Sequence, residues 1–455
     1  MTPPHDDSAA TASGTLAEFV TETTVSDLPD RGRNAVVRAI TDGVGVTLAG
    51  LAHESSEITG GFTGRVPRTG IPLDGATGGE RAELALHLGT AAHALDYDDL
   101  TWAMDGHPTV VLLPPILALT EHVDPTGEDV IEAYAVGFET ASYVAEPVSP
   151  DHYEAGWHAT STFGAIGATA TAASLLDLDV DATRRALTVA ASTPSGLKEN
   201  FGTMTKPLHA GLAARSGVTS ALLAADGFTA GDRAIEGDKG FWSLYSGATD
   251  AASELPPAPT SEGWTLVDPG IHIKKYPACY FSHTTIAATR SLLDANDIDP
   301  ETVEAVHVRA AGGARDAIAY TEPETALQSK FSMPHIVAVA MTADRVSVEY
   351  FEPSALDDET LAERRNLVEF TVDETLPYDS HAATVTIETA TDTYETATDH
   401  PPWTHEQPPS RDALEAKFVE AGTQTVDEAA AREAFDRLQA LDERRFAEIL
   451  APIRA

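Results

Sequence analysis

The stretch HATSTFGAIGATATAASLL, residues 158–176, indicates the fold class of this chain. Most of its residues are Ala, Gly, Ser or Thr, with only a few large apolar side chains between them. A helix with small side chains on every face can pack very closely against its neighbours, so we expect a buried helix here. Residues 206–227 have the same character and end at Gly227, a residue typical of helix C-termini. These two helices predict a helical core.

Two proline-rich linkers, residues 254–263 and 399–410, divide the 455-residue chain into three segments. The last segment is too short to form a sufficient core of its own, so we expect it to pack against the first. We therefore predict a mainly α fold. Its large all-helical domain combines residues 1–262 with residues 401–455, and a smaller α+β lid domain, residues 263–400, is inserted between them.

The middle segment changes its hydrophobic period. Residues 368–372 and 384–388 alternate apolar with polar side chains, which predicts two half-buried strands. Residues 284–293 and 335–343 have a helical pattern. This mixture indicates the α+β character of the inserted domain.

Helix starts are expected at Thr15 with Glu18, and at Thr425 with Glu428 ahead of a helical run over 429–449, because each pair has the spacing of a capping box. Residues 1–12, MTPPHDDSAATA, are acidic and polar and do not resemble a signal peptide. We expect them to be a disordered tail on a cytoplasmic protein.

The charge balance excludes several classes of protein. The chain has 71 Asp and Glu against 29 Lys and Arg, a formal charge of -42 that repels nucleic acids and anionic lipids. Its longest apolar stretch, residues 110–119, is too short for a membrane helix. The acidic excess is spread evenly and lysine is rare, a composition typical of proteins from salt-accumulating cells. We expect neither a nucleic-acid partner nor a membrane partner.

Standard cofactor motifs are absent: the sequence has no Walker loop, no GxGxxG after a strand, no HExxH and no GxSxG. The single cysteine, Cys279, excludes an internal disulfide and an iron–sulfur cluster. We therefore expect no cofactor and no metal, with the chemistry supplied by ordinary side chains.

The segment HALDYDDLTWAMDGHPT, residues 93–109, concentrates such side chains around His107. Its aspartates are Asp96, Asp98, Asp99 and Asp105. Three carboxylates within four residues repel one another, so they must be solvated, hydrogen-bonded or paired with a cation. The alternative is an ordinary loop at a helix end in an acidic protein.

Two further candidates stand at helix starts. His158 opens the first small-residue helix, where a buried structural histidine is the simpler interpretation. Lys206 and His209 begin the second. The positive end of a helix dipole disfavours a lysine, and a bound anion would relieve that conflict.

The last candidates follow the first linker: Lys274, Lys275, Cys279 and His283. Cys279 and His283 are four residues apart, so on a helix they would share a face, as a nucleophile and its base do. The alternative is that both are packing residues.

Five motifs together resemble the MmgE/PrpD family. They are DYDD at 96–99 with HP at 107–108, GWHATSTFG at 156–164, KPLHAG at 206–211, KKYPACYFSH at 274–283, and KFSMPH at 330–335. The resemblance runs in order over nearly the whole chain. It implies a metal-independent homodimer with a helical domain and an inserted lid. It also implies an enzyme of small carboxylates, such as the 2-methylcitrate dehydratases of propionate metabolism, the cis-aconitate decarboxylases or an epimerase.

Carried over by motif, the resemblance implies catalytic roles for Asp96, His107, His158 and Lys206. It places Lys274 on the lid side of the same pocket, and we add as substrate-binding candidates Lys275, His209, Cys279 and His283. Cys279 stands where the decarboxylases carry a histidine, and Leu100 stands where they usually carry a threonine. Both departures argue against the decarboxylase reaction.

Our leading hypothesis is dehydration of 2-methylcitrate or a similar hydroxy tricarboxylate. His107 and His158 would be the acid and the base in an order the sequence does not assign, while Asp96 orients a histidine. Lys206 and Lys274 would hold substrate carboxylates. The alternatives are a decarboxylase, an isomerase or epimerase of a small di- or tricarboxylate, a non-catalytic anion-binding protein, and a thiol hydrolase using Cys279.

Overall fold

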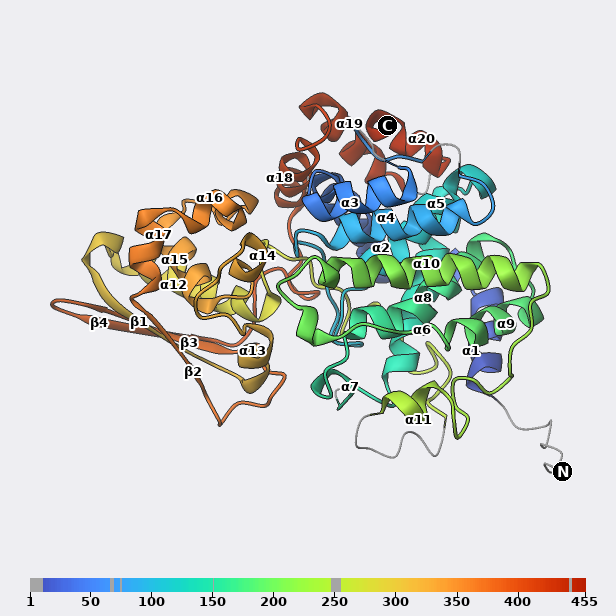
Figure 1. The fold of residues 1–455 in the computed structure, drawn as a ribbon, viewed down its shortest axis with the longest axis horizontal. Helices are drawn as coiled ribbons and strands as arrows, with labels where there is room; N and C mark the ends of the chain where they lie inside the picture. Colours follow the sequence, from blue (N-terminus) through green and yellow to red (C-terminus); the bar gives the residue numbers. More distant parts are fainter. Residues whose placement is uncertain (1–10, 66–68, 74–75, 150, 247–254, 442–443) are drawn as a thin grey trace.

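The structure is a computed structural model that describes residues 11–65, 69–73, 76–149, 151–246, 255–441 and 444–455. The chain is mainly helical and has one four-stranded sheet in its described part, so the prediction of a mainly α fold is confirmed. Figure 1 shows the sheet and its helices lying beside a larger group of helices.

The core of the helical part is formed by α4 (Glu80–His93), α5 (Thr109–Val123), α6 (Gly127–Ala145), α8 (Ala159–Leu175) and α10 (Thr205–Ala225). Helices α8 and α10 are the two predicted small-residue helices, and α8 is buried along nearly its whole length. A Cβ atom on Gly211 of α10 would lie 2.3 Å from the carbonyl oxygen of Leu86 on α4. Glycine is therefore required where α10 crosses α4, and this close crossing brings the start of α10 beside the end of α4.

Further helices surround this core: α1 (Ala12–Glu22), α2 (Asp30–Leu51), α3 (Glu54–Thr63), α7 (Asp151–Glu154), α9 (Val180–Ala190) and α11 (Phe241–Tyr245). The C-terminal helices are α18 (Arg411–Gly422), α19 (Glu428–Leu438) and α20 (Phe446–Leu450). Helix α18 packs against α2, and Lys417 of α18 forms a buried ion pair with Asp42 of α2 at 2.7 Å. The two ends of the chain thus share one core, as Figure 1 shows.

The sheet has the strand order β2-β1-β3-β4. Strand β1 (Val303–Ala310) is parallel to β2 (Val368–Val372) and antiparallel to β3 (Ala383–Thr389), which pairs with β4 (Thr393–Thr398). The predictions of β2 and β3 are confirmed. Its helices are α12 (His283–Asn296), α13 (Gly312–Ala317), α14 (Ala326–Ser329), α15 (Met333–Thr342), α16 (Pro353–Leu356) and α17 (Glu359–Arg365). We call strands β1–β4 with helices α12–α17 the sheet unit; the exact domain boundaries stay predictions.

Both predicted capping boxes are wrong. Helix α1 begins at Ala12 because the side chain of Thr11 accepts a hydrogen bond from Gly14 N at 3.0 Å, so Thr15 lies inside the helix. Of the expected tail, Ala12 therefore belongs to α1 and Thr11 caps it, while residues 1–10 lie outside the described residues.

The second box fails for a similar reason, because the cap of α19 is Asp427, whose carboxylate accepts from Ala430 N at 2.8 Å. Aspartate is a strong N-cap residue, and here it displaces Thr425. The helical run expected over 429–449 is also interrupted, because α19 ends at Leu438 and α20 begins at Phe446.

None of the described helices is by itself long and apolar enough to cross a membrane. Helices α2 and α3 meet that length and composition only when they are taken together, and they are bent by 85° at their junction.

Candidate active site

A pocket lies between the helical part and the sheet unit, with an empty volume of about 770 Å³ that includes open solvent. Its lining includes Asp96, His107, His158, Lys206 and Lys274. All five come from the catalytic and lid-side candidates, so the fold brings these residues together. Much of the remaining wall is aromatic.

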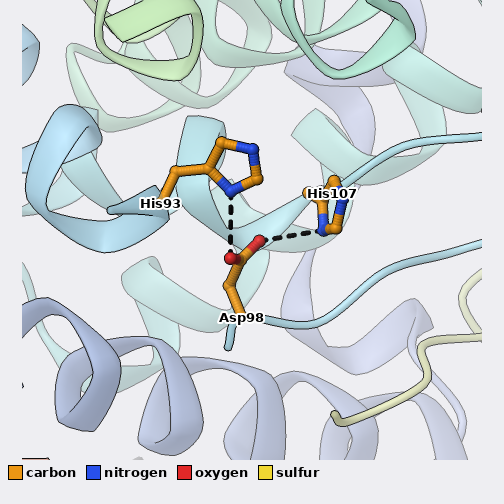
Figure 2. A group of neighbouring side chains, drawn as sticks. All are labelled: His93, Asp98 and His107. Carbon is orange, nitrogen blue, oxygen red and sulfur yellow. Dashed lines mark hydrogen bonds and ion pairs between the residues drawn. The ribbon is translucent and has the colours of Figure 1, made fainter. Parts of the chain in front are cut away.

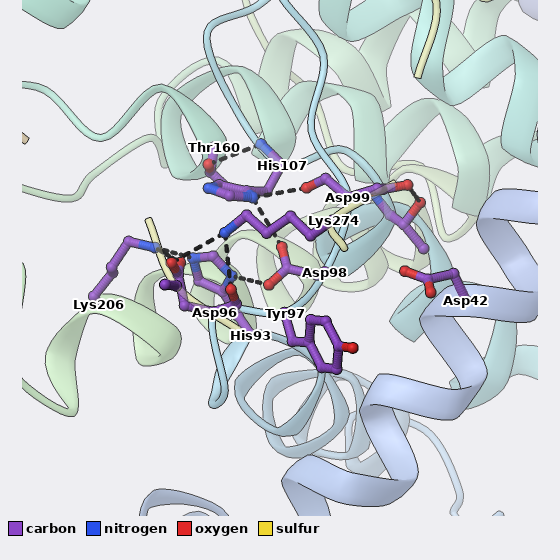
Figure 3. A network of polar contacts seen from close by, with 12 residues as sticks. Asp42, His93, Asp96, Tyr97, Asp98, Asp99, His107, Thr160, Lys206 and Lys274 are labelled. Carbon is purple, nitrogen blue, oxygen red and sulfur yellow. Dashed lines mark hydrogen bonds and ion pairs between the residues drawn. The ribbon is translucent and has the colours of Figure 1, made fainter. Parts of the chain in front are cut away.

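Asp96 joins the two lysines of the pocket. Its carboxylate lies 2.5 Å from Nζ of Lys206 and 3.0 Å from Nζ of Lys274, which also donates to the Asp96 carbonyl at 2.9 Å. Burial would raise the pKa of Asp96, but the two ammonium groups hold it well below its usual range. Two cations are thus fixed at one carboxylate on the pocket wall (Figure 3).

The backbone explains how Asp96 reaches both lysines. Asp96 follows the end of α4 with a φ of 51°, a left-handed conformation that aspartate tolerates better than most residues. Lys206 lies at the start of α10, so the predicted conflict between a lysine and a helix N-terminus is resolved by the Asp96 carboxylate.

Asp98 joins two histidines (Figure 2). Its carboxylate oxygens lie 2.9 Å from Nδ1 of His93 and 2.9 Å from Nδ1 of His107. Nδ1 of His107 is also 2.7 Å from the carbonyl oxygen of Asp99. Both partners of this nitrogen are acceptors, so Nδ1 of His107 carries the proton and Nε2 keeps a lone pair in the neutral ring.

The pKa values support neutral histidines beside a charged Asp98. Burial would raise the pKa of Asp98, but the contacts with His93 and His107 hold it well below its usual range. Burial lowers the pKa of His93 to about 3 and also lowers that of His107, although Asp98 opposes the shift in both. His107 is therefore available as a base at neutral pH.

The loop that carries His107 is held against α8. A Cβ atom on Gly106 would lie 2.9 Å from Thr160 N, so only glycine permits this approach. The backbone N–H of His107 donates to Thr160 Oγ1 at 3.0 Å. Leu100, in the same loop, exchanges backbone hydrogen bonds with His272, two residues before Lys274. These contacts fix His107 relative to Lys274.

His158 caps α8 and faces the same pocket. Its Nδ1 lies 3.1 Å from Nδ1 of His209, and its buried Nε2 has no hydrogen-bond partner among the described residues. Burial holds the pKa of His158 well below its usual range, so the ring is neutral. His209 does not line the pocket, and its contact with Nδ1 of His158 holds the His158 ring in place.

Of the remaining lid-side candidates, one lines the pocket and two do not. Cys279 lines the pocket, and burial raises the pKa of its thiol to about 11, which leaves it protonated and a poor nucleophile. His283 begins α12, whereas Cys279 precedes a short 3₁₀ turn, Tyr280–Ser282, so the expectation that the two share a helix face is wrong. Neither His283 nor Lys275 lines the pocket, and Lys275 lies near the rings of Tyr276 and Trp403.

Sequence reasoning missed one histidine, His93, and one lysine, Lys330. Nε2 of His93 lies 3.1 Å from Nζ of Lys206, so His93 connects the Asp98 pair to the lysine pair. Lys330, in the KFSMPH motif, is buried and donates to the carbonyl oxygens of Leu95 at 2.7 Å and Pro277 at 3.2 Å. It therefore ties the sheet unit to the residue before Asp96. The motifs contained both residues, but no local pattern showed their partners.

His93, Asp98 and His107 also offer three ligand atoms within 4.8 Å of one another, a spacing that could hold a metal ion. Binding a cation there would require both Nδ1 atoms to give up their protons. The ammonium group of Lys206, 3.1 Å from His93, would also repel it. In the structure, these three side chains form a hydrogen-bonded chain in which Asp98 joins His93 to His107. The absence of a metal stays a prediction.

The family of the protein follows from comparison with known sequences. The MmgE/PrpD N-terminal domain matches residues 14–254, and the MmgE/PrpD C-terminal domain matches residues 276–442. This chain therefore belongs to the MmgE/PrpD family. The resemblance inferred from the five motifs is confirmed.

Among curated relatives, the chain is 30% identical to the cis-aconitate decarboxylase of Homo sapiens over 209 residues, which are 45% of this chain and 43% of the human protein. It is 26% identical to the cis-aconitate decarboxylase-like protein oryM of Aspergillus oryzae over 371 residues, 76% of each chain. The match thus spans less than half the length of the human relative.

Proposed function

We propose that this protein is a lyase that acts on a small carboxylic acid with His107 as its base. The observation that carries the proposal is the contact between Asp98 and Nδ1 of His107, which leaves the Nε2 lone pair available beside Lys206 and Lys274. Our leading reaction is the dehydration of 2-methylcitrate or a similar hydroxy tricarboxylate.

In this reaction, Nε2 of His107 removes a proton from the carbon next to a substrate carboxylate. The electron pair of that C–H bond becomes the new C=C bond as the C–O bond on the neighbouring carbon breaks. Lys206 and Lys274 stabilise the charge that develops on the carboxylate. The neutral ring of His158 would donate a hydrogen bond to the leaving hydroxyl group, which takes up the proton collected by His107 and departs as water. Acid–base assistance of this kind typically contributes a factor of about 10² to 10⁴ in rate.

The second candidate is decarboxylation of cis-aconitate, which the names of the human and Aspergillus oryzae relatives favour. Here a C–C bond breaks, carbon dioxide leaves, and the electron pair that remains is quenched by a proton. The same histidines and lysines would serve, with one histidine protonating carbon. Isomerisation or epimerisation would need the proton transfer alone.

The experiment is an ultraviolet assay at molar KCl that follows the absorbance of the conjugated alkene. Absorbance that rises with 2-methylcitrate supports dehydration, and absorbance that falls with cis-aconitate while carbon dioxide is released supports decarboxylation. If both are silent, proton exchange of the substrates in D₂O tests the isomerase alternative. A protein without turnover or exchange on any of them contradicts the proposal.

Two variants make the assay specific to the site. His107→Gln should abolish turnover while the circular dichroism spectrum stays unchanged. His122→Gln is the matched control because His122 is exposed near the end of α5, outside the pocket. We also propose a homodimer, as the resemblance implies, and light scattering in the same buffer measures it.

A further inference from the structure

Three side chains form a second polar face in the same pocket: Trp102, Tyr280 and His381. The rings of Trp102 and His381 are stacked with centroids 5.6 Å apart, and the ring of Tyr280 meets that of His381 at 5.1 Å. Trp102 comes from the loop that carries His107, whereas Tyr280 and His381 come from the other side of the pocket, His381 from between β2 and β3. The face is therefore assembled from both parts of the molecule.

The polar atoms of these rings are buried and unused. Nε1 of Trp102, the hydroxyl group of Tyr280 and Nδ1 of His381 have no hydrogen-bond partner within the described ranges. Tyr280 as a whole is only 5% exposed. Folding normally pairs such groups, because a buried donor without a partner loses its bonds to water. Trp242 is an example, since its buried Nε1 donates to the carbonyl oxygen of Val144 at 2.9 Å.

The face can donate hydrogen bonds without carrying a charge. Burial raises the pKa of Tyr280, so the phenol keeps its proton, and an indole N–H never loses its proton in this range. Burial lowers the pKa of His381 to about 4, which makes this ring neutral as well. Among the described residues, the ammonium groups in the pocket lining are those of Lys206 and Lys274, which already share Asp96.

Acidic side chains occupy the pocket margin. Asp105 and Asp379 line both this pocket and an outer groove, and Asp105 accepts a hydrogen bond from Ser149. A substrate with several carboxylates therefore needs donors away from the lysines, and the ring face offers them.

We propose that Trp102, Tyr280 and His381 form an uncharged subsite that binds a second carboxylate of the substrate, remote from the lysine pair. This inference rests on the proposed function, because it assumes a substrate with more than one carboxylate. The subsite selects polycarboxylates over monocarboxylates, while Lys206 and Lys274 hold the carboxylate that takes part in the reaction.

Calorimetric binding to the inactive His107→Gln protein tests the subsite without turnover. The probes are tricarballylate, succinate and propionate, which carry progressively fewer carboxylates. Tyr280→Phe removes only the hydroxyl group and should weaken tricarballylate binding about 10- to 100-fold, the usual effect of losing a hydrogen bond to a charged group. Propionate binding should be unchanged. Trp102→Phe should behave in the same way, which guards against a folding defect in either single variant.

Tyr394→Phe, on β4 and outside the pocket, is the matched control. Added to the His107→Gln protein, it should leave the binding of all three probes unchanged. If tricarballylate binds equally well to the His107→Gln protein with and without Tyr280→Phe, the subsite is overturned while the lyase proposal stands. An equal loss of all three probes would also overturn it, because a general defect is not a subsite. If the His107→Gln protein binds none of the probes, the subsite is overturned, whereas the lyase proposal is decided separately by turnover of the unmodified protein.

Discussion

Asp98 lies 2.9 Å from Nδ1 of His107 and holds this ring with its Nε2 lone pair free for chemistry. The other oxygen of the same carboxylate contacts His93, which in turn contacts Lys206. One buried carboxylate thus orients the base and connects it to the lysine pair.

Asp98→Asn should lower kcat by about 10² to 10⁴, with little change in KM, because the base loses its orientation. The amide of asparagine can donate to Nδ1 of His107, which would move the ring proton to Nε2 and remove the lone pair. Steady-state kinetics measure the effect. Asp181→Asn, at an exposed position of α9, is the control and should leave kcat unchanged. An Asp98→Asn enzyme with parental kcat would show that the contact is only structural.

The pH profile of kcat provides a second test of the base. His107 must be unprotonated to accept a proton, and burial lowers its pKa from the ordinary value of 6.5. The base therefore stays active as the pH falls through 6.5, and kcat should decline only at lower pH. Measuring kcat at saturating substrate reduces the contribution of the substrate's own titration. A decline that begins above pH 6.5 would contradict His107 as a neutral buried base.

The fold could be predicted largely because its patterns are local. Small-residue helices, linkers and two strands are visible in short windows of sequence. Strand β4, TYETAT, was missed because it is polar and lies at the edge of the sheet. Strand β1 was also missed, although its Val306 and Val308 alternate with polar residues as expected for a strand. Its pairing with β3 shifts register between Val303 and Ala305.

The site was predicted only in part, because its contacts join distant segments. The types of residue at Asp96, His107 and Lys206 indicated acid–base chemistry, but Lys206 meets Asp96 across 110 positions of the chain. Only the fold reveals such pairs. For Cys279 and His283 the error was to expect a shared helix face that does not exist. A helical spacing was assumed where the helix had not yet begun.

Lys417→Met should destabilise the protein by about 3–5 kcal/mol, because it leaves the buried carboxylate of Asp42 without its cation. Lys417 also donates to the carbonyl oxygens of Tyr97 and Lys274 at 2.9 Å, so it joins α18 to both segments of the site. Thermal and urea unfolding measure the loss. Lys239→Met, at an exposed position, is the control.

The double variant Asp42→Asn with Lys417→Met separates the two contributions of this lysine. Removing the carboxylate charge should restore part of the stability, because the unpaired buried charge is gone. The carbonyl contacts stay lost, so recovery should be incomplete. Full recovery would show that Lys417 serves only to neutralise Asp42, and no recovery would show that the carbonyl contacts dominate.

Stability should rise with KCl because the formal charge of -42 repels itself across the surface. The Debye length falls from about 10 Å at 0.1 M salt to about 3 Å at 1 M, so most of this repulsion between exposed carboxylates is screened by molar salt. The melting temperature should therefore increase between these concentrations and then level off. NaCl should act almost as well as KCl if screening is the cause, whereas a gain confined to KCl would indicate specific cation binding. A melting temperature that stays constant or falls would show that acidic self-repulsion does not limit the stability of this fold.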